Sequence, residues 1–146
     1  MADVSTATPI RRTGPSQPYS GNAPLLDEDG YAIASITTIE QKVFKQGTKD
    51  EWQCFRWLLR SEGTLRPWYW SELTVQHLRP PNKDGEMNAL ATWMVCLGLR
   101  SRENLKPEDV SLETLQAVAG RVVRFRVVRK DGYYRVHMPT LTALEP

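Results

Sequence analysis

Cysteine and histidine are scarce in this sequence, which limits the metal and disulfide chemistry that it can carry. Cys54 and Cys96 each lie in an apolar segment, and His77 and His137 are isolated from them and from each other. Zinc ligands normally recur at short, regular spacings, so these four side chains predict no metal site. We expect both thiols to be buried and no cofactor to be bound.

Long hydrophobic runs are also absent. No segment of the 146 residues approaches the ~20 apolar residues that a membrane-spanning helix needs, so no membrane association is expected. The N-terminus has no basic start followed by an apolar stretch, which argues against a secretory signal peptide. We therefore expect a cytoplasmic protein, located in the host cytoplasm if the protein is viral.

The arrangements on which most enzyme mechanisms depend are missing as well. No histidine lies near a candidate nucleophile, there is no glycine-rich phosphate loop, and no pair of carboxylates can be placed on one face. Glu40, Glu51 and Glu72 are scattered, and we expect them to be solvated. The sequence therefore predicts a protein that is not an enzyme.

Length and composition predict one folded domain with an N-terminal arm. A chain of this size can bury one core but not comfortably two. Residues 1–26 are rich in Ser, Thr, Pro and Gly, and their four prolines oppose regular structure. We expect this segment to be a flexible arm that carries Arg11 and Arg12, and residues 27–146 to form the domain.

Three strands are predicted in the first half of the chain. Many β-branched residues favour a strand over residues 31–45, although its isoleucine spacing would also fit a helix. Polar turns separate this strand from two more, at residues 51–60 and 65–78. The first strand is so long that it needs a bulge or bend where its inward face changes.

Helical spacing replaces the strand pattern after the proline-containing break at residues 79–85. Apolar residues between Met87 and Leu97 recur at helical spacing, and Gly98 is placed to end that helix. A second short helix can be capped by Ser111. The two helices together form an insert between the third strand and the remaining strands.

The pair Asp131-Gly132 between two β-rich runs is the sharpest local signal in the sequence. Both central positions of a two-residue hairpin turn need positive φ, which Asp-Gly accommodates well. The turn sets the register of the hairpin, and it predicts the pairs Lys130–Tyr133, Val127–Val136 and Phe125–Met138. One face is then apolar, and the other carries Arg124, Arg126, Val128, Lys130, Tyr133, Arg135 and His137.

The predicted order is three strands, a helical insert and two strands. An OB barrel has this order, with its helix between strands three and four. The expected fold is therefore mainly β, a five-stranded OB-like barrel with a helical insert between strands three and four. A half-open sheet with a packed helix is the alternative.

The cationic face of the last hairpin is the first candidate binding surface. Sheets usually avoid like charges side by side, so arginines kept together indicate either acidic neighbours or an anionic ligand. A phosphate backbone would supply such a ligand. The alternative is a solvated face that is partly balanced by Glu40 or Glu72.

Tryptophans on the second and third strands supply the aromatic part of the candidate site. Leu73 and Val75 suggest the inward side of strand three, which would leave Trp68 and Trp70 facing outward, unless a bulge near Ser71 reverses them. Aromatic rings stack on bases for roughly 1–3 kcal/mol each, whatever the base. The predicted nucleic-acid-binding residues are Trp52, Arg56, Trp68, Trp70, Arg124, Arg126, Tyr133 and Arg135.

Three short segments carry a resemblance to a known family. They are Met94-Val95-Cys96-Leu97-Gly98-Leu99, Gly120-Arg121-Val122-Val123-Arg124-Phe125 and Gly132-Tyr133-Tyr134-Arg135-Val136. In these segments and in element order, the chain resembles small OB-fold single-stranded-DNA-binding proteins of bacteriophages and related mobile elements. The resemblance implies coating of exposed single strands during DNA replication or recombination. Many bacterial single-strand binders recruit partners through an acidic tail, whereas the last residues here are not acidic in that way.

Sequence-tolerant binding of single-stranded DNA is thus the leading hypothesis. A structural or interaction subunit is the alternative from another class, because protein interfaces also favour Trp, Tyr and Arg. The partner would then be another protein or a second copy of the chain. An RNA-binding subunit is a third possibility, which the sequence does not separate from the first.

Overall fold

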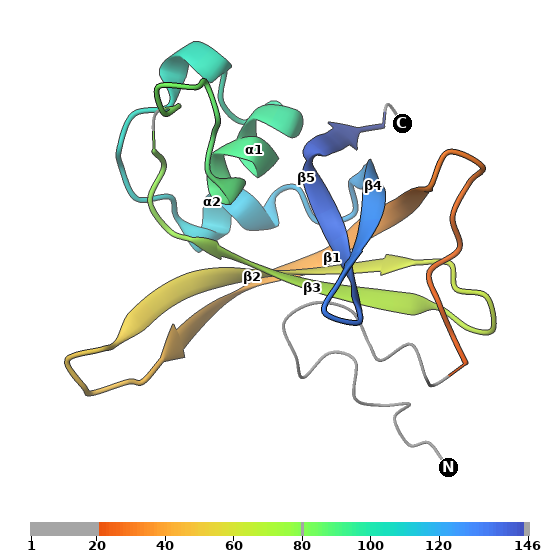
Figure 1. Ribbon diagram of the computed structural model, residues 1–146. Helices are drawn as coiled ribbons and strands as arrows, with labels where there is room; N and C mark the ends of the chain where they lie inside the picture. The colour runs from red at the N-terminus through yellow and green to blue at the C-terminus, as the bar shows by residue number, and fades with distance from the viewer. Residues whose placement is uncertain (1–20, 80, 145–146) are drawn as a thin grey trace.

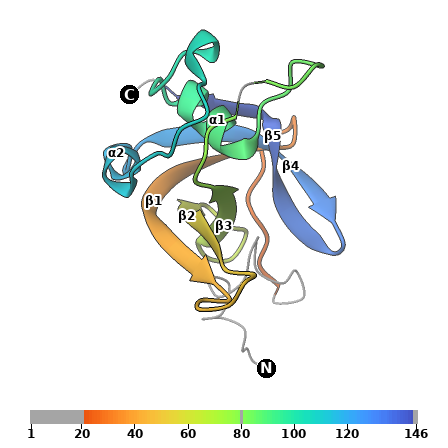
Figure 2. The same cartoon turned by 90° about the vertical axis from the view of Figure 1, so that its left-hand side faces the viewer.

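The computed structural model describes residues 21–79 and 81–144, which form one five-stranded antiparallel sheet with a few short helices (Figures 1 and 2). The strands are β1 (Tyr31–Phe44), β2 (Trp52–Ser61), β3 (Trp68–Val75), β4 (Val122–Lys130) and β5 (Tyr133–Ala143). The helices are α1 (Ala89–Cys96), the 3-10 turn η3 (Arg102–Asn104) and α2 (Leu112–Gln116). The predictions of a mainly β fold and of helices between the third and fourth strands are confirmed.

The sheet is open. Its strands lie in the order β3-β2-β1-β4-β5, so β3 and β5 are its two edges, and no backbone pairing joins them in the described residues. Figure 2 shows the β4–β5 hairpin diverging from the part formed by β1, β2 and β3. Closure into a barrel is therefore not observed, and the half-open sheet with a packed helix is the arrangement found.

Strand β1 changes its inward face at a bulge, as its length predicted. The register against β2 shifts between Ile36 and Thr38, so Thr37 is the extra residue. Before the shift β1 also pairs with β4, but that pairing ends at Ser35. Beyond it, β1 pairs with β2 alone, while β2 still pairs with β3 as far as Cys54. Past that point the ends of β1 and β2 continue as a two-stranded hairpin that extends away from the rest of the sheet (Figure 1).

The inward side of β3 is the reverse of the expected one. Trp68 and Trp70 are 0% and 1% exposed, whereas Leu73 and Val75 lie half-buried on the other side. Pairing with β2 is continuous along β3, so no bulge at Ser71 is involved. The outward orientation predicted for Trp68 and Trp70 is therefore wrong.

Aromatic packing explains why the indoles of β3 turn inward. The ring of Trp70 meets Phe125 edge-on at 5.1 Å between centroids, and the ring of Trp68 meets Tyr134 at 5.5 Å. The Trp70 Nε1 donates to Ser61 Oγ at 3.0 Å, which satisfies its polar atom. Two indoles bury far more apolar area than Leu73 and Val75 would in their place.

Helix α1 packs against β5 and β3, and its buried Trp93 belongs to the hydrophobic core. Asn88 caps its N-terminus by accepting a hydrogen bond from the Ala91 N–H at 3.0 Å. Trp93 stacks on Trp57 of β2, with ring centroids 4.4 Å apart and planes 12° apart. Gly98 follows the helix with φ of 76°, as the sequence predicted for its end. No helix among the described residues has the length and apolarity to cross a membrane.

Residues before Asp27 already contact the sheet. The buried Asn22 accepts hydrogen bonds from the N–H groups of Leu65 and Arg66, and Pro24 bridges to Gly63. Residues 22–24 are therefore held against the turn between β2 and β3. Residues 1–20, with Arg11 and Arg12, lie outside the described residues.

The last hairpin has the predicted turn. Asp131 and Gly132 both have positive φ, and the pairs Lys130–Tyr133 and Val127–Val136 are present. The predicted pair Phe125–Met138 is wrong, because the register shifts between Arg124 and Arg126. Local turn chemistry thus sets the register near the turn, and a bulge changes it farther away.

Candidate nucleic-acid interface

The projecting end of β1 and β2, residues 42–53, is called the β1–β2 arm below. Phe44 and Trp52 face each other across it as a cross-strand pair. Their rings stack with centroids 5.3 Å apart, and the two residues are 39% and 42% exposed. The four other tryptophans all lie in the described chain and are buried. Trp52 is therefore the one indole that a ligand can reach directly.

Phe44 was not predicted as a site residue. The signal that could have found it is the position of the turn, because residues 45–51 separate the two rings and place them opposite each other. Cross-strand aromatic pairs stabilise a hairpin by roughly 0.2–1 kcal/mol, which helps an arm without a core of its own. Val43 is also exposed, so the arm carries apolar surface beyond the stacked pair.

Lysines accompany the stacked pair. Lys42 lies on the same side of β1 as Phe44, and Lys45 and Lys49 lie in the turn that follows. None of the three takes part in an ion pair within the described part of the chain. The only carboxylates of the arm are Asp50 and Glu51, and Glu51 accepts a hydrogen bond from the Gly47 N–H.

Two of the predicted arginines are held by carboxylates of the protein itself. Arg56 donates two hydrogen bonds to Glu40, at 2.6 and 3.1 Å. Arg124 pairs with Asp27 at 2.9 Å, and its guanidinium lies 3.9 Å from the centre of the Tyr31 ring. The Tyr31 backbone N–H and Arg124 both hold the pKa of Asp27 below its usual value. Acidic neighbours therefore balance these two positions.

The remaining residues of the cationic face separate into exposed and half-buried groups. Arg126 is exposed, pairs across the hairpin with His137 and belongs to no ion pair in the described chain. Lys130 is exposed at the turn, opposite the half-buried Tyr133. Arg135 is half-buried, and its positive charge lowers the pKa of Glu72. Of the predicted cationic face, Arg126 and Lys130 are thus the exposed cations that belong to no ion pair in the described chain.

Trp68 and Trp70 do not belong to this surface. Both indoles lie in the core between β3, β4 and β5, so neither can stack on a ligand at the outer face. Of the predicted aromatic residues, Trp52 is exposed and Tyr133 is half-buried. The structure therefore brings exposed aromatics and unpaired lysines together at the β1–β2 arm, and places Arg126 and Lys130 near the half-buried Tyr133 at the other hairpin, rather than along β3.

Glu72 was expected to be solvated, and this expectation is wrong. Its residue is only 8% exposed, because it shares the inward side of β3 with the two tryptophans. Burial raises the pKa of its carboxyl to about 7, against the lowering effects of Arg135 and the Val136 backbone N–H. The signal in the sequence is its spacing of two and four residues from Trp70 and Trp68.

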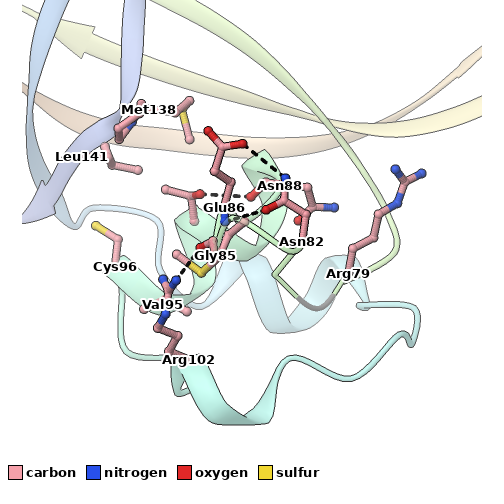
Figure 3. A pocket seen from close by; sticks show the side chains of 13 residues that line it. Arg79, Asn82, Gly85, Glu86, Asn88, Val95, Cys96, Arg102, Met138 and Leu141 are labelled. Carbon is pink, nitrogen blue, oxygen red and sulfur yellow. Dashed lines mark hydrogen bonds between the residues drawn. The ribbon is translucent and has the colours of Figure 1, made fainter.

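A cavity of about 760 Å³ lies beside α1 and β5 (Figure 3). Its apolar lining comes from α1 and β5 and from the loop before α1. Polar groups also line it: Asn82 donates to Glu86 at 3.2 Å, and Arg102 donates to the Gly85 carbonyl. The half-buried Cys96 lines this cavity, and burial raises the pKa of its thiol to about 11, so the thiol is neutral at physiological pH.

No protein-family model, no curated protein and no solved structure matches the chain. Among the described residues, no group of three or more His, Cys, Asp and Glu side chains is placed to hold a metal ion. We therefore infer the chemistry of the β1–β2 arm and the β4–β5 turn from their side chains. Exposed rings can stack, and unpaired lysines and arginine can contact anions.

Proposed function

We propose that the protein binds single-stranded DNA without strong sequence preference, through the β1–β2 arm and the β4–β5 turn. The stacked and exposed Phe44–Trp52 pair with its neighbouring lysines is the observation that carries this proposal. Stacking on a base would cover the rings, and the lysines would contact phosphates on either side. Coating of single strands during replication or recombination is the corresponding role.

The element order supports the same proposal. We propose that the fold is an OB-like sheet whose β3–β5 side stays open. In OB folds, the loops between strands one and two and between strands four and five flank the bound oligonucleotide. Here these loops carry Lys45 and Lys49 at one end, and Lys130 and Tyr133 at the other.

The residues proposed to bind differ from those that the sequence predicted. Arg56 and Arg124 would first have to leave Glu40 and Asp27, and Trp68 and Trp70 are buried. The proposed set is Phe44, Trp52, Lys45, Lys49, Arg126, Lys130 and Tyr133.

A fluorescence titration tests this function. Adding oligothymidine of about 20 nucleotides, longer than the roughly 4–16 that one OB fold occupies, should quench the emission of Trp52. The affinity should fall steeply with salt, because phosphate contacts release counterions. Absence of quenching at low salt, or equal affinity for duplex DNA, would contradict the proposal.

Variants locate the binding on the arm. Phe44→Ala and Trp52→Ala should each weaken binding of a labelled oligothymidine by about 5- to 150-fold, which corresponds to the roughly 1–3 kcal/mol of one stacked base. Leu65→Ala, at an exposed apolar residue of the β2–β3 turn, is the matched control and should bind like the parent. Equal losses in all three variants would show that the arm has no special role.

A protein interface is the second candidate. The exposure of Val43 beside the stacked pair favours it, because an apolar protrusion of this kind can anchor in a partner's pocket. Sedimentation would detect a second copy of the chain as the partner. Oligouridine in the same titration separates RNA from DNA.

A further inference from the structure

The two edge strands approach each other through side chains on the open side of the sheet. Trp68 of β3 meets Tyr134 of β5 edge-on, and Arg135 of β5 acts on the Glu72 carboxyl of β3. No backbone pairing joins β3 and β5 in the described chain. This contact zone is called the β3–β5 seam below; side chains hold it, together with the Val136 backbone N–H that acts on the Glu72 carboxyl.

Buried polar atoms without partners gather at the β3–β5 seam strands. Among the residues that the structure describes, six buried side-chain nitrogen or oxygen atoms lack a hydrogen-bond partner, and five of them belong to β3 or β5. They are Trp68 Nε1, Ser71 Oγ, Glu72 Oε2, Arg135 Nε and His137 Nδ1. Trp68 Nε1 and Glu72 Oε2 lie on the inward side of β3, whereas Ser71 lies on its other side with Leu73 and Val75, so the indole and the carboxyl are the unpartnered groups that β3 brings to the seam.

Glu72 is the titratable carboxyl in this zone. Arg135 is the charged side chain that acts on it, the residue opposite it on β2 is the uncharged Trp57, and α1 contributes no acidic or basic residue. His137 lies two residues beyond Arg135 along β5. When Glu72 ionises, a charge is therefore buried with Oε2 unpartnered, and it is compensated by Arg135 and by the Val136 backbone N–H.

We propose that the β3–β5 seam is a gate that opens when Glu72 loses its proton. The neutral carboxyl stays buried and the seam stays closed, whereas the carboxylate draws water between β3 and β5 and exposes the Trp68 indole. Burial raises the pKa of Glu72 from 4.5 to about 7 in the closed form. The stabilisation of the closed form is therefore complete below pH 4.5 and is lost as the pH rises through about 7.

Acrylamide quenching of tryptophan fluorescence measures how far the Trp68 indole becomes exposed when the seam opens. The Trp52→Phe background removes the exposed indole, so the signal comes from buried tryptophans. Quenching should rise about twofold or more between pH 5 and pH 9, with a midpoint near 7, and Glu72→Gln should abolish the rise. Arg135→Gln should move the midpoint to higher pH, because Arg135 lowers the pKa of Glu72.

Two controls and one independent measurement decide the outcome. Glu40→Gln removes a carboxylate that pairs with Arg56 away from the seam, and His137→Asn removes the nearby imidazole; both should keep the rise. In the parent protein, hydrogen-exchange protection of β3 amides should fall over the same pH range. A parent without a pH response, a response that survives in Glu72→Gln, or one that disappears in His137→Asn would overturn the proposal. The gate does not depend on DNA binding.

Discussion

Trp52 and Glu72 lie in environments that are unusual for their residue types: the tryptophan is exposed and the glutamate is buried. An exposed tryptophan leaves a large ring in water, and a buried carboxyl leaves a titratable group among apolar rings. We propose that the first binds a ligand, and the raised pKa of the second predicts that the stability of the fold depends on pH. Single substitutions at each position therefore test one property at a time.

Glu72→Gln should stabilise the folded protein at high pH. The pKa of Glu72 is about 7 in the folded protein, above the ordinary value of 4.5 that we take for the unfolded chain. Burial of the protonated carboxyl therefore contributes fully to stability below pH 4.5, and this contribution is lost as the pH rises through 7. The difference corresponds to at most about 3 kcal/mol near pH 8, and opening of the seam would reduce it. Urea unfolding of both proteins at about pH 5 and pH 8 checks this. A gain of equal size at both values would contradict the assignment to Glu72.

At the scale of elements, the β1–β2 arm and the β4–β5 hairpin present cations differently. The arm lysines belong to no ion pair in the described chain, whereas Arg124 of the hairpin is paired with Asp27. Unpaired cations release counterions when they contact phosphates, and already paired ones contribute less. The arm lysines should therefore contribute to the salt dependence of binding, together with Arg126 and Lys130 of the hairpin, which belong to no ion pair in the described chain either.

Replacing Lys45 and Lys49 by Gln together should flatten the salt dependence of oligothymidine binding. Each lost phosphate contact lowers the slope of log K against log salt by roughly 0.7 for a single strand. Lys106→Gln, an exposed lysine beyond η3, is the matched control and should leave the slope unchanged. An unchanged slope in the double variant would place the phosphate contacts elsewhere.

Local signals in the sequence predict the elements well and their packing less well. The Asp131-Gly132 turn, the Ser111 cap and the bulge in β1 each depend on neighbouring residues, and all are present. Both sides of β3 are rich in apolar residues, so its orientation depends on the distant Phe125 and Tyr134.

The site's charges depend on similar long-range contacts. Arg56 and Glu40 lie 16 residues apart, and Arg124 and Asp27 lie 97 residues apart. The turn that sets Phe44 opposite Trp52 also sets Glu40 opposite Arg56, whereas the pairing of Arg124 with Asp27 has no local sequence signal. The exposed Trp52 could be predicted because it lies beside a turn, beyond the reach of the core.

On the scale of the whole molecule, one hydrophobic cluster joins all five strands to both α-helices. Trp57 of β2, Trp93 of α1 and Phe125 of β4 belong to it together, and Leu115 brings in α2. No strand has a core of its own, so no part of the described domain is expected to unfold alone at equilibrium, apart from local opening.

Thermal unfolding near pH 5, where the seam is expected to be closed, should therefore be a single transition. Far-ultraviolet circular dichroism reports the sheet, and tryptophan fluorescence of the Trp52→Phe protein reports the core. The two midpoints should coincide, because both signals follow the loss of the same cluster. Separate midpoints would show that the helical insert or the hairpin unfolds independently.

The inward position of Glu72 has a consequence for how copies of the chain meet. β3 is an edge strand that contains no lysine and no proline, the residues that usually discourage intermolecular strand pairing. A charge that points inward from an edge strand also opposes such pairing, because a flat, continuous sheet across two molecules would trap it in a dry interface. Above about pH 7, where Glu72 carries its charge, the edge of β3 should therefore pair with a second copy of the chain less readily than below pH 7.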